Sequence, residues 1–258
     1  MAGAKVISKK TPDDFAKMEV AGQCVAAMHR AVREAAAPGV TTRELDAIAA
    51  EVLRERGCRS SFLGYHGFPA VICASPNSAI VHGIPDGYTL RNGDIISIDA
   101  GAIYEGWHGD AAFTMAIGSV PDEVQQLLDV TEEALWNGLR EARHGNRLGD
   151  VGHAIESTAE PHGYGVVREY IGHGIGRQMH EAPNVPNYGV PGKGLKLKAG
   201  MALAIEPMFN LGTAETVVLD DGWTVVTADG ALSAHFEHTV LITADGPVVS
   251  TLPKPLSL

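Results

Sequence analysis

The pattern of apolar and polar positions predicts four helices in two pairs. Thr11-Pro12-Asp13-Asp14 is typical of a helix start, because Thr can cap the helix, Pro suits its first turn and acids favour the positive end of its dipole. Thr41 and Glu44 have the spacing of a capping box, in which each side chain bonds the backbone of the other. We expect helices over residues 12–36, 41–56, 121–143 and 147–162.

Several segments outside the helices favour β-strands. Residues 68–74, 95–104 and 107–117 are rich in β-branched and aromatic residues, and Glu105-Gly106 predicts a turn between the last two. The chain beyond His162 alternates short apolar runs with Gly and Pro turns. Because no linker or low-complexity stretch divides the chain, we expect one α+β domain over residues 1–258.

Two ten-residue segments of the chain resemble each other. Leu90–Asp99 and Leu197–Glu206 each contain a leucine, a basic residue, a glycine turn, an apolar strand and a final carboxylate. Two expected helices precede each segment. A match of this length can arise by chance. If the match is structural, the fold consists of two related halves in which Asp99 and Glu206 occupy equivalent places.

Composition and charge narrow the class of protein. The chain has 258 residues, 45% of them hydrophobic, which is ample for a large core. A net charge of −11 argues against nucleic acid as the main partner, since phosphate binding needs clustered Lys and Arg. Three cysteines without paired spacing are no disulfide framework, and the start of the chain lacks the apolar core of a signal peptide. No apolar run is long enough for a membrane helix. We therefore expect a cytoplasmic protein in a reducing compartment.

Five acids and histidines are candidates for metal binding. Most of them lie in apolar or glycine-rich surroundings, where an ionised carboxylate is costly unless it is paired or metal-bound. For any one of them alone, a solvated strand end is the better interpretation, but the group as a whole indicates a shared counter-charge. The candidates are Asp99, Asp110, His173, Glu206 and Glu237. This oxygen-rich set suits Mn, Fe, Co or Zn, and two such ions roughly 3.5–4 Å apart can share a water and lower its pKa.

Three histidines stand beside glycines or acids. They are His82 before Gly83, His173 before Gly174, and His180 before Glu181. A lone histidine near glycines is most often structural, but three in this context favour function, since neutral imidazole suits hydrogen bonding to a scissile amide or its oxyanion. The chain has neither GxSxG nor HExxH, which excludes an α/β-hydrolase serine site and a zincin.

The motifs together resemble those of type I methionine aminopeptidases in their short bacterial form, which are pita-bread metallopeptidases of family M24. The motifs are NSAIVHGIP (77–85), GDIISIDAG (93–101), HGD (108–110), GHGIGRQMHEAP (172–183), AIEP (204–207) and SAHFEHT (233–239). Their order and gaps fit over essentially the whole chain. The resemblance implies a curved antiparallel sheet flanked by two pairs of helices with pseudo-twofold symmetry, which agrees with the internal match.

The resemblance also implies an activity and roles for the candidates. The activity is removal of the initiator methionine from nascent polypeptides, with a small second residue preferred, by two divalent ions (Co, Mn, Fe or Zn) that the five candidate ligands hold. Asp110 and Glu237 would bridge the ions. His82 would contact the substrate amide, His180 would stabilise the carbonyl oxygen as it becomes anionic, and Glu206 would carry the proton to the leaving amine.

Further residues are implied for the methionine pocket and for a monovalent cation. The pocket would be lined, beside His82 and His180, by Phe62, Tyr65, His66, Phe68, Cys73, Met179 and Trp223. Met179 stands where Phe is common, Phe62 where Cys is common and Phe68 where Tyr is common, yet all stay apolar and suit a thioether. Asn77 and Ser233 would help to hold Na or K.

The resemblance implies nascent polypeptide N-termini as partners, a transient ribosome contact, no nucleic acid or membrane partner, and a monomer. Prolidase and aminopeptidase P are the nearest alternatives, but they carry an extra N-terminal domain, whereas this chain begins about 60 residues before its first pocket segment. Non-catalytic pita-bread binding proteins and creatinase-like members lack part of the ligand set, which is complete here. His235 stands where Gln is often found, and the sequence assigns no consequence to it.

Overall fold

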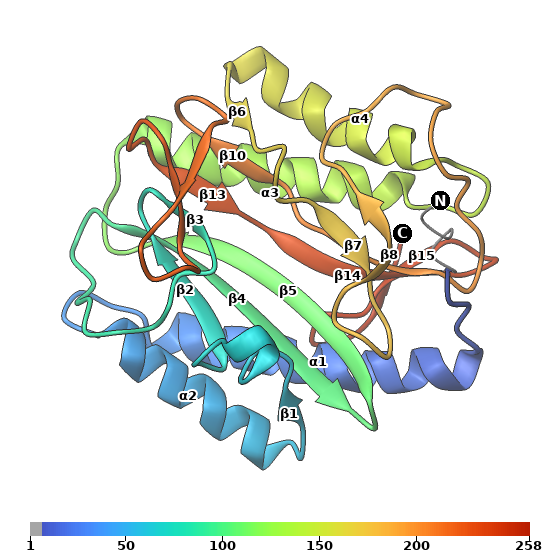
Figure 1. Ribbon diagram of the computed structural model, residues 1–258, viewed down its shortest axis with the longest axis horizontal. Helices are drawn as coiled ribbons and strands as arrows, with labels where there is room; N and C mark the ends of the chain where they lie inside the picture. Colours follow the sequence, from blue (N-terminus) through green and yellow to red (C-terminus); the bar gives the residue numbers. More distant parts are fainter. Residues whose placement is uncertain (1–6) are drawn as a thin grey trace.

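A computed structural model describes residues 7–258, and it contains the four expected helices (Figure 1). The start of the chain, where the sequence predicts no signal peptide, lies outside this range. The helices are α1 (Pro12–Ala35), α2 (Thr42–Glu55), α3 (Asp122–Glu141) and α4 (Leu148–Ala159). Both predicted N-caps are confirmed, since Thr11 and Asp14 form one capping box and Thr41 and Glu44 form another. None of the helices within the described residues is long and apolar enough to cross a membrane.

The strands form one large sheet and two small ones, and all their pairings are antiparallel. The ten-stranded sheet has the order β1-β4-β5-β14-β9-β7-β8, with β2 paired to β4, β15 to β14 and β16 to β15. Its strands are β1 (Arg59–Ser60), β2 (Ile72–Pro76), β4 (Ile95–Tyr104), β5 (Trp107–Ala116), β7 (Gly172–Gly174), β8 (Glu181–Val185), β9 (Ala202–Ile205), β14 (Glu237–Ile242), β15 (Pro247–Val249) and β16 (Leu256–Ser257). One small sheet has the order β13 (Ser233–His235), β10 (Met208–Asn210) and β6 (Gly165–Val166). The other has the order β11 (Thr216–Val218), β12 (Val225–Thr227) and β3 (Ala79–Val81).

One predicted strand begins later than expected. Residues 68–74 were predicted as a strand, but β2 begins at Ile72 and ends at Pro76. Pro69 has no N–H to give to a ladder. The N–H groups of Val71 and Ile72 donate to the side-chain carboxylate of Asp46 on α2, at 2.9 and 3.1 Å. The backbone before β2 is therefore held by α2 rather than by a neighbouring strand.

The internal sequence match corresponds to equivalent places in the fold. β5 and β14 pair at the middle of the large sheet, where Glu237 lies opposite Ala112. β4, which contains Asp99, flanks β5, and β9, which ends just before Glu206, flanks β14. α1 and α2 precede β4, α3 and α4 precede β9, and the two pairs lie along opposite halves of the sheet (Figure 1). The pseudo-twofold arrangement of a pita-bread fold is thereby confirmed.

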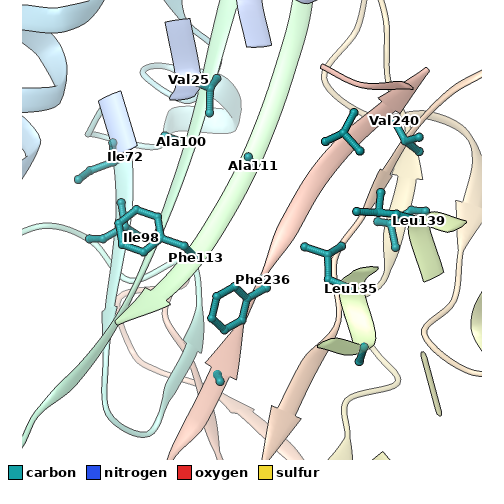
Figure 2. Packing of buried hydrophobic residues seen from close by; sticks show 14 of the residues in the cluster. Val25, Ile72, Ile98, Ala100, Ala111, Phe113, Leu135, Leu139, Phe236 and Val240 are labelled. Carbon is teal, nitrogen blue, oxygen red and sulfur yellow. The ribbon is translucent and has the colours of Figure 1, made fainter. Parts of the chain in front are cut away.

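The core lies between the helices and one face of the sheet. Figure 2 shows Val25 of α1 beside Ala100 and Ala111 of the central strands, and Leu139 of α3 beside Val240 of β14. These residues are all buried. Because side chains alternate along a strand, every second residue of the same strands emerges on the opposite, concave face. The candidate ligands occupy those alternate positions.

Candidate active site

Strand alternation brings the predicted acids together on the concave face. Asp99 lies between Ile98 and Ala100, which both belong to the core on the helix side. Asp110 precedes the core residue Ala111 on β5, and Glu237 begins the adjacent β14. All three acids therefore emerge from neighbouring strands of one face.

His173 joins these acids from a glycine-flanked strand. A Cβ atom at Gly172 would lie 2.4 Å from the carbonyl oxygen of Ala204, and one at Gly174 would lie 2.3 Å from that of Ala182. The two glycines therefore let β7 pack tightly against its neighbours. His173 Nδ1 lies 2.9 Å from the carbonyl oxygen of Gly174. Nδ1 must carry the hydrogen in this contact, so the lone pair of Nε2 faces the acids.

The distances at the centre of the site suit a shared cation. His173 Nε2 lies 3.7 Å from Asp110 Oδ2 and 3.7 Å from Glu206 Oε1. Asp110, His173 and Glu237 each offer one ligand atom, and these atoms lie within 4.8 Å of one another. Within residues 7–258, Asp99 Oδ1, Asp110 Oδ1 and Glu237 Oε1 are buried and have no hydrogen-bond partner. Buried carboxylate oxygens without partners are costly, and a divalent ion would satisfy them.

Electrostatics at this cluster also favour a cation. Burial raises the pKa of Asp110 to about 7. Burial, and then the neighbouring carboxylates, raise the pKa values of Asp99, Glu206 and Glu237 well above their ordinary range. Like charges crowded in a low-dielectric site resist ionisation unless a positive charge compensates them. The ligand set therefore fits divalent metal ions chemically and geometrically.

The ligands line a cavity of about 280 Å³. Its lining residues are Phe62, Tyr65, His66, Phe68, Cys73, His82, Asp99, Asp110, His173, Met179, His180, Glu206, Trp223 and Glu237. Every residue predicted for metal, catalysis or the methionine pocket thus lies in one cavity. The aromatic wall is tightly packed, with the ring centroids of Phe68 and Trp223 5.1 Å apart and those of Phe62 and Phe68 6.4 Å apart.

His82 reaches the cavity from an unusual backbone conformation. Its φ is 61°, in the left-handed region that non-glycine residues rarely adopt, and such strain clusters at functional sites. A Cβ at Gly83 would lie 2.3 Å from the carbonyl oxygen of Ala74. Glycine is therefore required next to His82. Burial lowers the pKa of His82 to about 4, so the ring is neutral at pH 7 and acts through hydrogen bonds.

His180 also lines the cavity, and an aromatic neighbour holds its ring. Its ring centroid is 4.2 Å from that of His173 and 5.5 Å from that of Tyr65, on which it stacks. The Tyr65 hydroxyl lies 2.8 Å from His180 Nδ1. Burial lowers the pKa of His180 to about 4. This ring is therefore also neutral at pH 7.

The residue after His180 is anchored by a buried ion pair that sequence reasoning missed. Glu181 accepts hydrogen bonds from Lys10 Nζ at 2.9 Å, from the backbone N–H of Gln178 at 3.2 Å, and from the Ser8 hydroxyl. The Lys10 side chain is only 1% exposed, and its backbone N–H donates to Gly200. No local pattern pointed to this lysine, since its partner lies 171 residues away.

His235 is a second missed residue of the site. It is 2% exposed, and its Nε2 lies 3.7 Å from Glu206 Oε2. Neither ring nitrogen has a hydrogen-bond partner within the described part of the chain, and burial lowers the pKa of His235 to about 3. Its position two residues before Glu237 was the available signal, because alternate residues of an extended chain share a face.

Asn77 and Ser233 meet outside the cavity lining. The backbone N–H of Ser233 donates to the carbonyl oxygen of Asn77 at 3.0 Å. Asn77 adopts a φ of 57°, and its side chain bonds Asp94 and the N–H of Ile95. The structure thus brings the two residues together, and their binding of a monovalent cation stays a prediction.

Comparisons with known proteins agree with the fold and identify the family. The sequence model of metallopeptidase family M24 matches residues 16–244, so the chain belongs to that family of hydrolytic metalloenzymes. Methionine aminopeptidase 1 of Mycobacterium tuberculosis (strain CDC 1551 / Oshkosh) is 51% identical over 259 residues, which cover 98% of this chain and 97% of that protein. The crystal structure of a Thermotoga maritima methionine aminopeptidase superposes with a TM-score of 0.94 at 44% identity and covers 96% of this chain and 100% of its own. Within family M24, the chain therefore falls among the methionine aminopeptidases.

A more distant structure shares only the fold. The prolidase of Pyrococcus furiosus matches with a TM-score of 0.78 at 23% identity, over 95% of this chain but 66% of its own.

Proposed function

We propose that residues 1–258 act as one dinuclear metalloaminopeptidase domain that removes the N-terminal methionine from nascent polypeptides. The observation that carries the proposal is the single cavity of about 280 Å³ that joins the metal-ligand cluster to an apolar aromatic wall. A buried wall of Phe, Tyr, Trp and Met side chains suits a thioether side chain, and the ligands lie where the first peptide bond would then be placed.

Two divalent ions, chosen from Co, Mn, Fe and Zn, would be held by Asp99, Asp110, His173, Glu206 and Glu237. When bound, the ions polarise the scissile carbonyl and lower the pKa of water. The four carboxylates balance the charge of two divalent ions, which explains why so many acids are buried together.

The protein's own groups supply orientation and proton transfer. His82 hydrogen-bonds the substrate amide, and the Nε2–H of His180 donates to the carbonyl oxygen as negative charge develops there. Glu206 accepts a proton from the attacking water and returns it to the leaving amine. Phe68 and Trp223 hold the methionine side chain and exclude water from the site.

We extend the proposal to specificity and context. A small second residue is preferred, and Asn77 with Ser233 binds Na or K beside the sheet. The enzyme acts as a cytoplasmic monomer that meets its substrates through transient contact with the ribosome. These points are supported by resemblance to the family.

The experiment is hydrolysis of Met-Ala-Ser, Met-Leu-Ser and Pro-Ala-Ser by metal-stripped protein to which Mn, Fe, Co or Zn is restored. We expect metal-dependent cleavage of Met-Ala-Ser alone. Glu237→Gln should lose both metal and turnover, whereas His82→Ala should keep the metal and lose rate. Cleavage of an X-Pro peptide instead would assign the protein to the proline-specific enzymes, and no cleavage with any metal would favour a binding protein.

A further inference from the structure

Tyr65 makes a polar contact that its place in the methionine pocket does not require. Its hydroxyl oxygen lies 2.8 Å from His180 Nδ1, while its ring stacks on the His180 ring at an interplanar angle of 30°. The two residues are 115 positions apart, so the fold itself creates the contact. Both residues line the cavity. The wall needs only the ring of Tyr65, and a phenylalanine would supply it.

The contact determines which nitrogen of His180 carries its hydrogen. A neutral imidazole has one N–H. Burial raises the pKa of the Tyr65 phenol, so its O–H keeps its hydrogen. If Nδ1 carried the hydrogen of His180, it would donate to the Tyr65 oxygen, and Nε2 would present only a lone pair to the cavity. If the Tyr65 O–H donates to Nδ1 instead, Nε2 carries the hydrogen of His180 and can donate it, as stabilisation of an oxyanion requires.

The backbone on the other side of His180 is also fixed. Glu181 is tied to Lys10 and Gln178, so the main chain at His180 has little freedom. The remaining variables are the rotation of the ring and its tautomer. The Tyr65 hydroxyl restrains both, because a hydrogen bond to Nδ1 fixes the plane of the ring and the position of its proton.

We propose that Tyr65 is a positioning residue, whose hydroxyl donates to His180 Nδ1 and thereby holds His180 in the tautomer that directs Nε2–H at the substrate carbonyl oxygen. This inference rests on the proposed function, in which His180 stabilises the developing oxyanion. It gives Tyr65 a role in rate as well as in binding.

The test is a double-mutant cycle in Mn-loaded enzyme with Met-Ala-Ser as substrate. Tyr65→Phe keeps the aromatic wall and removes one oxygen, so kcat should fall about tenfold, the effect of one hydrogen bond, with KM changed less than about twofold. In a His180→Ala background, the same change should have no further effect on kcat. Tyr164→Phe, which removes a partly buried hydroxyl outside the cavity, is the matched control and should leave both constants unchanged.

A spectroscopic measurement tests the tautomer without turnover. In zinc-loaded protein, the imidazole ¹⁵N shifts of His180 should report hydrogen on Nε2, and Tyr65→Phe should shift population to the other tautomer. An unchanged kcat in Tyr65→Phe, an equal loss in both backgrounds, or an unchanged His180 signature would overturn the inference. Failure of wild-type protein to cleave Met-Ala-Ser with any metal would instead refute the proposed function, and the ¹⁵N measurement would still decide the tautomer.

Discussion

Removal of the metal should make the stability of the protein fall as pH rises above 7. Burial raises the pKa of Asp110 to about 7 and those of Asp99, Glu206 and Glu237 well above their ordinary range. The folded state therefore binds more protons than the unfolded chain, whose carboxyls ionise near pH 4. A raised carboxyl pKa gives stability that is present at low pH and is lost as pH rises toward the folded pKa.

The lowered pKa values of the buried histidines set the pH range in which the carboxyl contribution to stability can be measured alone. Burial lowers the pKa values of several histidines to about 3 or 4, and this opposes the carboxyl effect below pH 6.5. Above pH 7 these histidines are neutral in both states. Each carboxyl that is still protonated in the folded state then costs about 1.4 kcal/mol of stability per pH unit. Between about pH 7 and 8.5, the stability of the metal-free protein should therefore fall with this slope for each such group.

The assay is urea unfolding of chelator-treated and Mn-loaded protein at half-unit steps over this pH range. The metal-free protein should lose stability with pH, and the Mn-loaded protein should not. Glu237→Gln removes one ionisable group from the cluster and should flatten the metal-free slope. Glu215→Gln alters an exposed carboxylate and should leave the slope unchanged. A metal-free stability that is constant or rises between pH 7 and 8.5 would refute the reasoning.

Three substitutions test other parts of the structure. Lys10→Met leaves the buried Glu181 carboxylate without its cation and should cost about 3 kcal/mol in urea unfolding, most of which Lys10→Met/Glu181→Gln should restore; equal losses would contradict the pairing. Gly83→Ala places a Cβ 2.3 Å from the carbonyl oxygen of Ala74, so kcat/KM should fall at least about tenfold while metal content by mass spectrometry stays constant. His235→Leu should lower kcat several-fold, whereas His235→Gln keeps a donor near the catalytic glutamate and should retain most activity; equal rates in both would exclude a polar role.

The parts of the fold that depend on local physics could be predicted from the sequence. The N-caps predicted at Thr11 and Thr41 located the starts of the first two helices, because a cap satisfies backbone donors within four residues. The internal match placed Asp99 and Glu206 at equivalent positions in the two halves, since each follows an apolar run after a glycine turn. The start of β2 was missed because it depends on Asp46, a side chain of another element.

The candidate site was predictable as a set of residues but not as a geometry. Motifs identified the ligands and the pocket, and all of them line one cavity. The contacts around His180 were not predictable from the sequence. Lys10 bonds Glu181 and Tyr65 bonds His180, and in each pair the two residues are more than a hundred positions apart. The sequence offered only the position of His235 two residues before Glu237, and the distance of 3.7 Å from its Nε2 to Glu206 Oε2 shows that it belongs to the site.

The most direct test of the central claim is a metal titration of stripped protein, followed by hydrolysis of Met-Ala-Ser. The proposed site predicts no turnover without metal, a rise in rate that saturates after about two equivalents of metal, and no rise in Asp110→Asn, whose amide cannot supply the bridging charge. Full activity in the stripped wild-type protein, or metal-dependent activity in Asp110→Asn equal to that of wild type, would contradict it.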